Sequence, residues 1–300
     1  MSQKEKPSNK PFKQQNLKAW QPLFTPKVII SSFYLLGLSF LIIAIIVGAV
    51  GSSVKTYEAR YDDKCTLNET CTVDIEIEED LEGPVYLMYE LTNYYQNHRR
   101  YAESRSNAQL MGNDVSWYQL EECIPRKTKD GKDDDLDQVY YPCGIIAFSH
   151  FNDSFSITES GTNLDFSDSD ISWDSDSDKK FIKNDDPTGI VEVEDVSNQH
   201  FIVWMRTAAF PTFRKLYSKT SSDLKKGIKQ IQIDNQYPSN QYDGEKRIII
   251  TNKCYYGGNN RFLAVAYGIV SGLLFLVATI FTFKHIKSKP KPCQLAWRNF

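Results

Sequence analysis

Two long runs of apolar residues lie near the two ends of the chain. No charged residue occurs from Val28 to Val50 or from Phe262 to Phe283. At about 1.5 Å rise per residue, each run as a helix exceeds the ~30 Å hydrocarbon core of a bilayer. An amphipathic core helix would carry polar residues at every third or fourth position, and neither run does. The first run is too long for the apolar part of a signal peptide and lacks a clear small-residue cleavage site. We therefore predict a retained signal anchor at 28–53 and a second transmembrane helix at 262–283.

The segment between these runs, residues 54–261, has the pattern of short strands. Val73, Ile75 and Ile77 alternate with acidic residues, which is the period of a half-buried strand. Other β-type runs lie at 85–91, 144–148, 190–196, 201–205, 228–233 and 247–251. This pattern predicts a mainly antiparallel β-sandwich. Residues 94–110 lack alternation and are predicted to be helical, and the Asp/Ser-rich tract 165–178 is predicted to be a solvated loop.

Charge orients the two predicted spans. The tail at residues 1–27 has six lysines against one glutamate, and the tail at 284–300 has four lysines, one arginine and no acid. The segment between the spans has 37 of the 38 acidic residues. Positively charged flanks stay in the cytosol, so both termini are predicted to be cytosolic and residues 54–261 exoplasmic.

Cysteines and glycosylation sequons support this orientation. Five of the six cysteines lie between the spans, where oxidation is allowed. Pairing neighbours would join Cys65 to Cys71 and Cys123 to Cys143. Four cysteines allow three pairings, so neighbour pairing is a hypothesis, and it leaves Cys254 without a partner on that side. The same segment contains two N-glycosylation sequons, one beginning at Asn68 and the other at Asn152.

Known catalytic patterns are missing from the sequence. It has no Walker A motif, nucleophile elbow, zinc-protease motif or Cys-x-x-Cys pair, and no Asp-Lys-Thr-Gly-Thr phosphorylation motif. The spacing of Asp174, Asp176 and Asp178 resembles the start of a calcium loop, but Lys179 occupies the position of the turn glycine and no glutamate closes the loop. We therefore expect no enzymatic activity, no metal and no cofactor.

Two further features concern binding. A basic cluster around Tyr101 could bind phosphate or lipid headgroups, and it consists of His98, Arg99, Arg100 and Arg105. Pairing of these side chains with the domain's own carboxylates is the favoured interpretation. Small residues at a spacing of four lie on one face of each predicted span, which allows close helix approach in lipid. These residues are Ala44 and Gly48 in the first span and Ala264, Gly268 and Gly272 in the second.

Several long motifs resemble those of the accessory subunits of phospholipid flippases, the cell-division-cycle-fifty/Lem-three type. The likeness starts at about residue 12 and covers nearly the whole chain. Its motifs are Phe12–Gln15, Ala19–Pro22, Pro84–Tyr101, Ser104–Ser106, Tyr141–Ala147, Phe151–Ser154, Phe201–Tyr217 and Gly257–Leu263.

The resemblance implies a non-catalytic subunit of a fourth-subfamily P-type ATPase. That ATPase moves phospholipids from the exoplasmic to the cytoplasmic leaflet, and the subunit supports its stability, its activity and its export from the endoplasmic reticulum. The expected partners are the ATPase and membrane phospholipids, with no nucleic acid. Residence in the endoplasmic reticulum, the Golgi or endosomal membranes, or the plasma membrane is compatible with this topology. Family members usually have two disulfides in the first cysteine cluster, whereas only Cys65 and Cys71 are present here.

Two other classes of protein were weighed. ATP-gated and degenerin-type channel subunits share two spans, but they have many more ectodomain cysteines and a polar pore lining. The second span here offers only Ser271, Thr279 and Thr282, with Tyr267 near one end. An ecto-enzyme anchored at both ends is disfavoured by the missing catalytic motifs.

Overall fold

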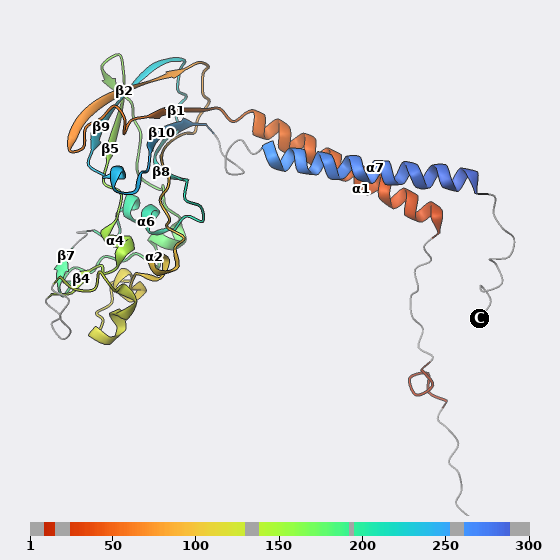
Figure 1. Cartoon of the computed structure of the whole chain (residues 1–300), viewed down its shortest axis with the longest axis horizontal. Helices are drawn as coiled ribbons and strands as arrows, with labels where there is room; N and C mark the ends of the chain where they lie inside the picture. Colours follow the sequence, from red (N-terminus) through yellow and green to blue (C-terminus); the bar gives the residue numbers. More distant parts are fainter. Residues whose placement is uncertain (1–8, 16–24, 130–137, 192–194, 253–260, 289–300) are drawn as a thin grey trace, which may run out of the picture. The chain divides into compact units, whose positions relative to one another are not determined.

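The computed structural model describes residues 9–15, 25–129, 138–191, 195–252 and 261–288. The chain divides into two compact units, residues 1–52 with 260–300 and residues 53–259. The first unit contains two 27-residue helices that pack against each other, α1 (Pro26–Ser52) and α7 (Arg261–Lys287) (Figure 1). Both are long and apolar enough to cross a membrane. They confirm the two helices predicted from the charge-free runs.

The second unit contains two four-stranded sheets. The first has the order β1 (Thr56–Arg60), β10 (Lys246–Thr251), β3 (Val85–Leu91), β8 (Phe213–Thr220). The second has the order β2 (Glu69–Ile77), β9 (Gly227–Asn235), β5 (Ser154–Glu159), β6 (Thr162–Asn163). All neighbours in both sheets are antiparallel. A short parallel pair, β4 (Tyr140–Tyr141) with β7 (Ile190–Val191), lies apart from them.

One hydrophobic core joins the two sheets, which makes the arrangement a sandwich. Alternate residues of β2, Val73, Ile75 and Ile77, are buried, while the acidic residues between them are exposed. They pack in the same cluster as Leu87 of β3 and Ile248 of β10. The predicted mainly antiparallel β-sandwich is thus confirmed, because two-residue periodicity places one face of each strand in the core.

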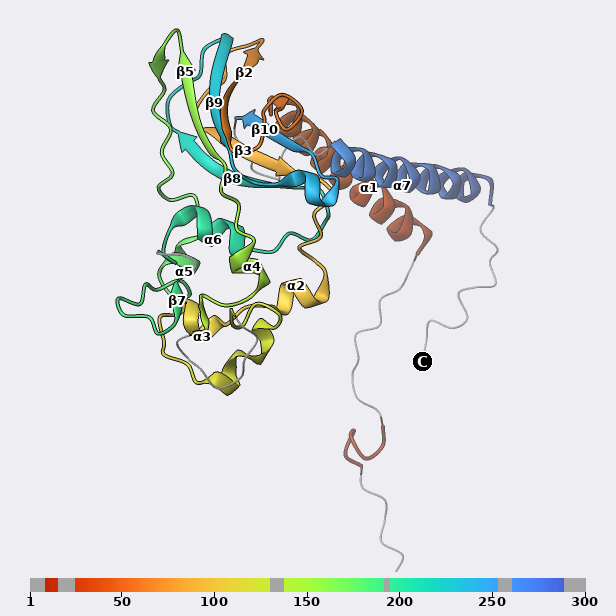
Figure 2. The ribbon, with the colours of Figure 1, turned by 60° about the vertical axis from the view of Figure 1, so that its left-hand side comes forward.

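Short helices cover one end of the sandwich, as Figures 1 and 2 both show. A second core cluster fills this end, and it combines aromatic residues from the helices with Tyr89 and Phe213 of the strands. The elements are α2 (Arg99–Glu103), α3 (Asn107–Leu110), the 3₁₀ helix Trp117–Cys123, α4 (Ile145–Phe148), α5 (Asp174–Ser177), α6 (Gln199–Met205) and the 3₁₀ helix Ser239–Tyr242.

Two predicted strands in this region are wrong. Residues 144–148 and 201–205 form α4 and α6 instead. The Asn198 side chain accepts a hydrogen bond from His200 N at 2.9 Å and so caps the first turn of α6. The predicted strand 190–196 is strand only at its first two residues in the described part of the chain. The predicted helix 94–110 is present as two short helices, α2 and α3.

The Asp/Ser-rich tract is also more structured than its composition predicts. Asp176 in α5 has a side chain only 2% exposed, paired with Lys180 at 2.7 Å and with Arg206. Two cations compensate the burial of this one carboxylate. Part of the predicted solvated loop 165–178 therefore packs against α6.

Candidate functional site

The helices α1 and α7 pack against each other at glycines that are only partly those predicted. A Cβ added at Gly37 would lie 3.2 Å from the Phe275 ring, and Gly37 O accepts a 2.8 Å hydrogen bond from Ser271 Oγ. Nearer the other end, a Cβ on Gly48 would lie 3.6 Å from the Ala264 Cβ. The sequence analysis found Gly48 and Ala264 but missed Gly37, which lies seven residues, or two turns, before Ala44.

The remaining predicted small residues of α7 are free of α1. A Cβ on Gly268 or Gly272 would meet no atom within 4 Å in the described residues. The face of α7 toward α1 is instead marked by buried Ser271 and Ala278. A notch of two glycines thus stays open on α7, which is the geometry that lets a further helix approach closely in lipid.

In the second unit, the basic cluster around Tyr101 is largely used inside the domain. Arg99 Nε pairs with Glu103 Oε1 at 3.0 Å, and Arg105 donates to Met205 O at 3.3 Å. The Tyr101 hydroxyl lies 2.8 Å from Ser149 Oγ, and burial raises the pKa of this phenol above its usual value. These contacts agree with the favoured structural interpretation.

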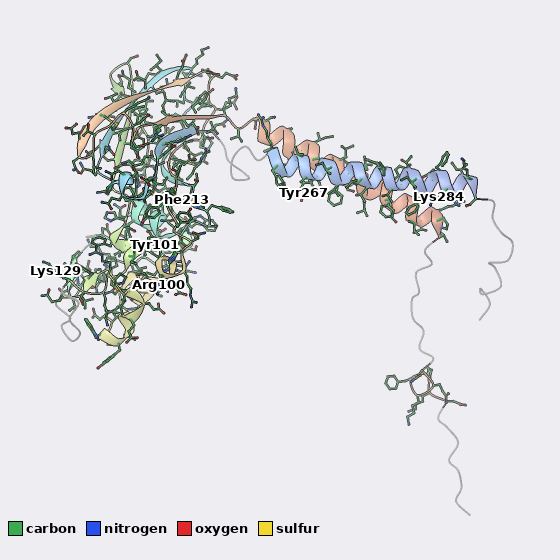
Figure 3. The ribbon with its side chains drawn as sticks, viewed as in Figure 1. Arg100, Tyr101, Lys129, Phe213, Tyr267 and Lys284 are labelled. Carbon is green, nitrogen blue, oxygen red and sulfur yellow. A yellow bond between two sulfur atoms is a disulfide. The ribbon has the colours of Figure 1, made fainter. Side chains whose placement is uncertain are left out.

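Arg100 is the exception in this cluster. Its side chain is exposed and makes no ion pair among the described residues. Figure 3 labels it beside Tyr101 on α2. It lines an open cavity of about 1100 Å³ that Glu103, Glu121 and Glu122 also line. Because carboxylates share this cavity, it does not have the uniformly positive surface that an anion site requires.

A buried charged centre lies under the sandwich end. Lys246 of β10 and Asp153 have side chains 1% and 0% exposed, and Lys246 Nζ lies 2.8 Å from Asp153 Oδ2. Asp153 also accepts from the Tyr61 hydroxyl at 2.7 Å and from the backbone N of Gln236 at 2.7 Å. The sequence analysis missed this pair, since no pattern marks a lysine on the core face of a strand. It fixes the backbone beside Asn152.

A second buried lysine closes the end of α6. Lys215 Nζ donates to Val203 O at 2.9 Å, to Trp204 O at 3.0 Å and to Arg206 O. Burial lowers the pKa of Lys215 to about 7, with a smaller contribution from Arg206. The last backbone carbonyls of a helix have no hydrogen-bond donor within the helix, and the ammonium group of Lys215 supplies donors to them at the end of α6.

Both neighbouring cysteine pairs are disulfides in the structure. Cys65–Cys71 and Cys123–Cys143 each have a Cα–Cα distance of 5.6 Å. Cys123 and Cys143 belong to a small buried cluster with Leu120 and Val139. Cys254 and Cys293 lie outside the described residues.

The two sequon asparagines have different surroundings. Asn68 is exposed in a tight turn with φ of 64° before β2. Asn152 is exposed as well, but it lines a cavity of about 450 Å³.

Together these features describe a two-helix membrane protein with a β-sandwich domain and an open helix notch. Comparison with known proteins agrees with this class. The model of the LEM3 (ligand-effect modulator 3) family / CDC50 family matches residues 49–291. The chain belongs to this family.

Three relatives illustrate the similarity. The chain is 33% identical to ALA-interacting subunit 3 of Arabidopsis thaliana, over 98% of this chain and 91% of that protein. It is 33% identical to cell cycle control protein 50A of Bos taurus, over 92% and 88%. It is 31% identical to the phospholipid-transporting ATPase accessory subunit CRF1 of Saccharomyces cerevisiae, over 96% and 86%.

Proposed function

We propose that this chain is the non-catalytic accessory subunit of a phospholipid-transporting P-type ATPase of the fourth subfamily. Family membership over nearly the whole chain supports this proposal, together with a yeast relative that is named as such a subunit. The subunit would stabilise the ATPase, support its export from the endoplasmic reticulum, and assist lipid transport from the exoplasmic to the cytoplasmic leaflet. Both termini would face the cytosol.

The open notch of α7 is the observation that supports a binding role for the helix pair. Gly37, Gly48 and Ala264 lie in the contact between α1 and α7, whereas a Cβ added at Gly268 or Gly272 would meet no atom within 4 Å among the described residues. Two glycines one turn apart permit a partner helix to approach its backbone. We assign this notch to a transmembrane helix of the ATPase.

The subunit would act as a clamp without chemistry of its own. The lysine-rich tail, the helix pair and the exoplasmic domain are three contact regions on one chain, so each raises the effective concentration of the others. Such a clamp can shift the conformational equilibrium of the ATPase only by binding its conformers with different affinity.

The test replaces both notch glycines, Gly268→Leu with Gly272→Leu, in the full chain. We expect the ATPase to co-purify less in mild detergent, while maturation of the glycans reports that the exoplasmic domain folds. A control variant, Val265→Leu with Ile269→Leu, changes exposed positions at the same spacing and keeps both glycines. It should retain the ATPase fully. If the glycine variant matures and binds as well as the control, the notch is not the interface.

A further inference from the structure

Residues of α3, α5 and α6 line a cavity of about 590 Å³ at the helical end of the domain, where Figure 2 labels the three helices. This volume falls within the range of roughly 300–1,000 Å³ that is typical of small-molecule sites. Three cationic side chains line the cavity, Arg105, Lys180 and Arg206. Among the described residues of its wall, Asp176 is the only acidic one. The cavity therefore differs in charge from the one beside Arg100, which three glutamates line.

The Asp176 carboxylate compensates only part of this positive charge. It accepts from Lys180 Nζ at 2.7 Å and from Arg206 Nε. Burial alone would raise the pKa of Asp176, but the ion pairs with Arg206 and Lys180 lower it below its usual value, so the carboxylate stays ionised. Its side chain is only 2% exposed, which leaves the accessible surface of the cavity to the cations. One negative charge against three positive charges leaves two positive charges uncompensated.

The three cations keep donors for a ligand. Arg105 donates from Nη1 to Met205 O at 3.3 Å, and it forms no ion pair in the described part of the chain. Arg206 uses Nε for Asp176, and its Cζ lies 4.1 Å from the centroid of the Trp173 ring, which holds the guanidinium plane. The terminal nitrogens of Arg206 have no hydrogen bond to any described residue. An anion can therefore bind here without breaking contacts of the fold.

The base of the cavity is the hydrophobic core. Leu110, Phe181 and Met205 line it, and all three are buried in the core cluster of the helical end. Because these side chains already pack within the fold, their role is to hold the charged groups in place. Charges of one sign above low-dielectric walls focus the electric field and raise the local concentration of small ions of the opposite sign. The cavity is thus built to attract an anion.

We propose that this cavity binds the phosphate group of a phosphate monoester. The planar guanidinium groups of Arg105 and Arg206 match pairs of phosphate oxygens, and Lys180 adds a point charge. A monoester has a charge of about −1.5 to −2 near pH 7, which matches the two uncompensated positive charges, whereas a diester has a single negative charge. Inorganic phosphate shares this chemistry and serves as the probe. The proposal does not depend on the proposed ATPase partner.

The first test measures binding to the full chain in mild detergent. Radiolabelled inorganic phosphate is dialysed to equilibrium at constant ionic strength, and unlabelled compounds compete with it. We expect glycerol 3-phosphate, a monoester, to compete at a concentration about tenfold lower than dimethyl phosphate, a diester, because it makes at least one more charge-assisted hydrogen bond. Absence of saturable phosphate binding, or equal competition by the two compounds, would overturn the proposal.

A double variant tests the cations of the wall. Arg105→Gln with Lys180→Gln should weaken phosphate binding by about tenfold for each cation removed. The matched control, Arg100→Gln with Lys179→Gln, lowers the net charge of the chain equally at exposed positions that do not line this cavity, and it should bind like the wild type. Lys180→Gln alone changes an exposed side chain, so it gives the tenfold step without risk to folding. Equal weakening in the double variant and in its control would refute a specific site.

A lipid competitor distinguishes the two sources of such a group. Phosphatidic acid, added to the detergent micelles, presents the same monoester as a headgroup. If it displaces phosphate at a lower concentration than glycerol 3-phosphate does, the ligand is a lipid headgroup, and if it competes no better, the ligand is a soluble phosphate. Both results support a monoester site, and failure of both compounds to displace phosphate would contradict it.

Discussion

Replacing Lys246 with methionine tests whether the buried charged centre holds the exoplasmic domain together. The substitution keeps an unbranched apolar stem but leaves the Asp153 carboxylate, which is 0% exposed, without a cation. It also removes the donor to Tyr237 O at 2.6 Å and to the Asn235 side chain. Removing one partner of a buried pair costs about 3–5 kcal/mol.

This loss is large enough to measure by thermal unfolding. In a domain of about 200 residues, 1 kcal/mol corresponds to a melting-temperature shift of about 2–4 °C, so we expect Lys246→Met to melt lower by roughly 10 °C. Tryptophan fluorescence of the full chain in mild detergent is a suitable signal, since Trp204 is buried in the core at the helical end.

A matched control separates burial from pairing. Arg99→Met breaks the ion pair with Glu103, whose side chains are 86% and 60% exposed, and it should cost less than about 1 kcal/mol. Adding Asp153→Asn to Lys246→Met removes the uncompensated charge, keeps the sequon, and should recover part of the loss. The reasoning would be refuted if Lys246→Met melted no lower than Arg99→Met.

Two further predictions concern the same domain. Because burial lowers the pKa of Lys215 to about 7 from 10.5, the unfolded chain binds the additional proton between these pH values. The stability of the wild type relative to Lys215→Met should therefore rise by about 1.4 kcal/mol per pH unit from pH 7 toward 10.5 and stay flat below pH 7, as measured by denaturant unfolding. Cys143→Ser should impair export more than Cys65→Ser, since the Cys123–Cys143 bridge closes a 21-residue loop inside a buried cluster, and the larger loop is worth about 1 kcal/mol more. Glycan maturation would measure export, and the opposite ranking would contradict this argument.

The sequence predicted those elements whose hydrophobic pattern is compatible with only one type of secondary structure. The charge-free runs could only be long apolar helices, and the alternation at Val73–Ile77 could only be a strand with one buried face. It did not predict α6, because Phe201–Met205 is a short apolar run that could be a buried strand or a buried helix. The cap at Asn198 was the available signal for a helix, but Asn is also common in turns.

The sites were predictable where chemistry is local in sequence. Neighbouring cysteines lie close in sequence, and the structure joins both pairs as disulfides, whereas the glycans at the two sequons stay a prediction. The Asp153–Lys246 pair could not be read, since its members are 93 residues apart and each looks like an ordinary surface charge. The same holds for the cavity beside Asn152, which combines residues from several separate segments.

The pairing of the sheet edges has a consequence for the order in which the protein forms during synthesis. Among the described residues β1 pairs with β10 alone, and Thr56 meets Thr251 across 195 residues of chain. The edge strand β2 likewise pairs with β9, which is synthesised much later than β2. The first two strands to leave the ribosome therefore gain their partners only when nearly the whole β-sandwich domain has been synthesised. Non-local pairing of this kind folds slowly and leaves apolar strand faces exposed until the last strands have been synthesised.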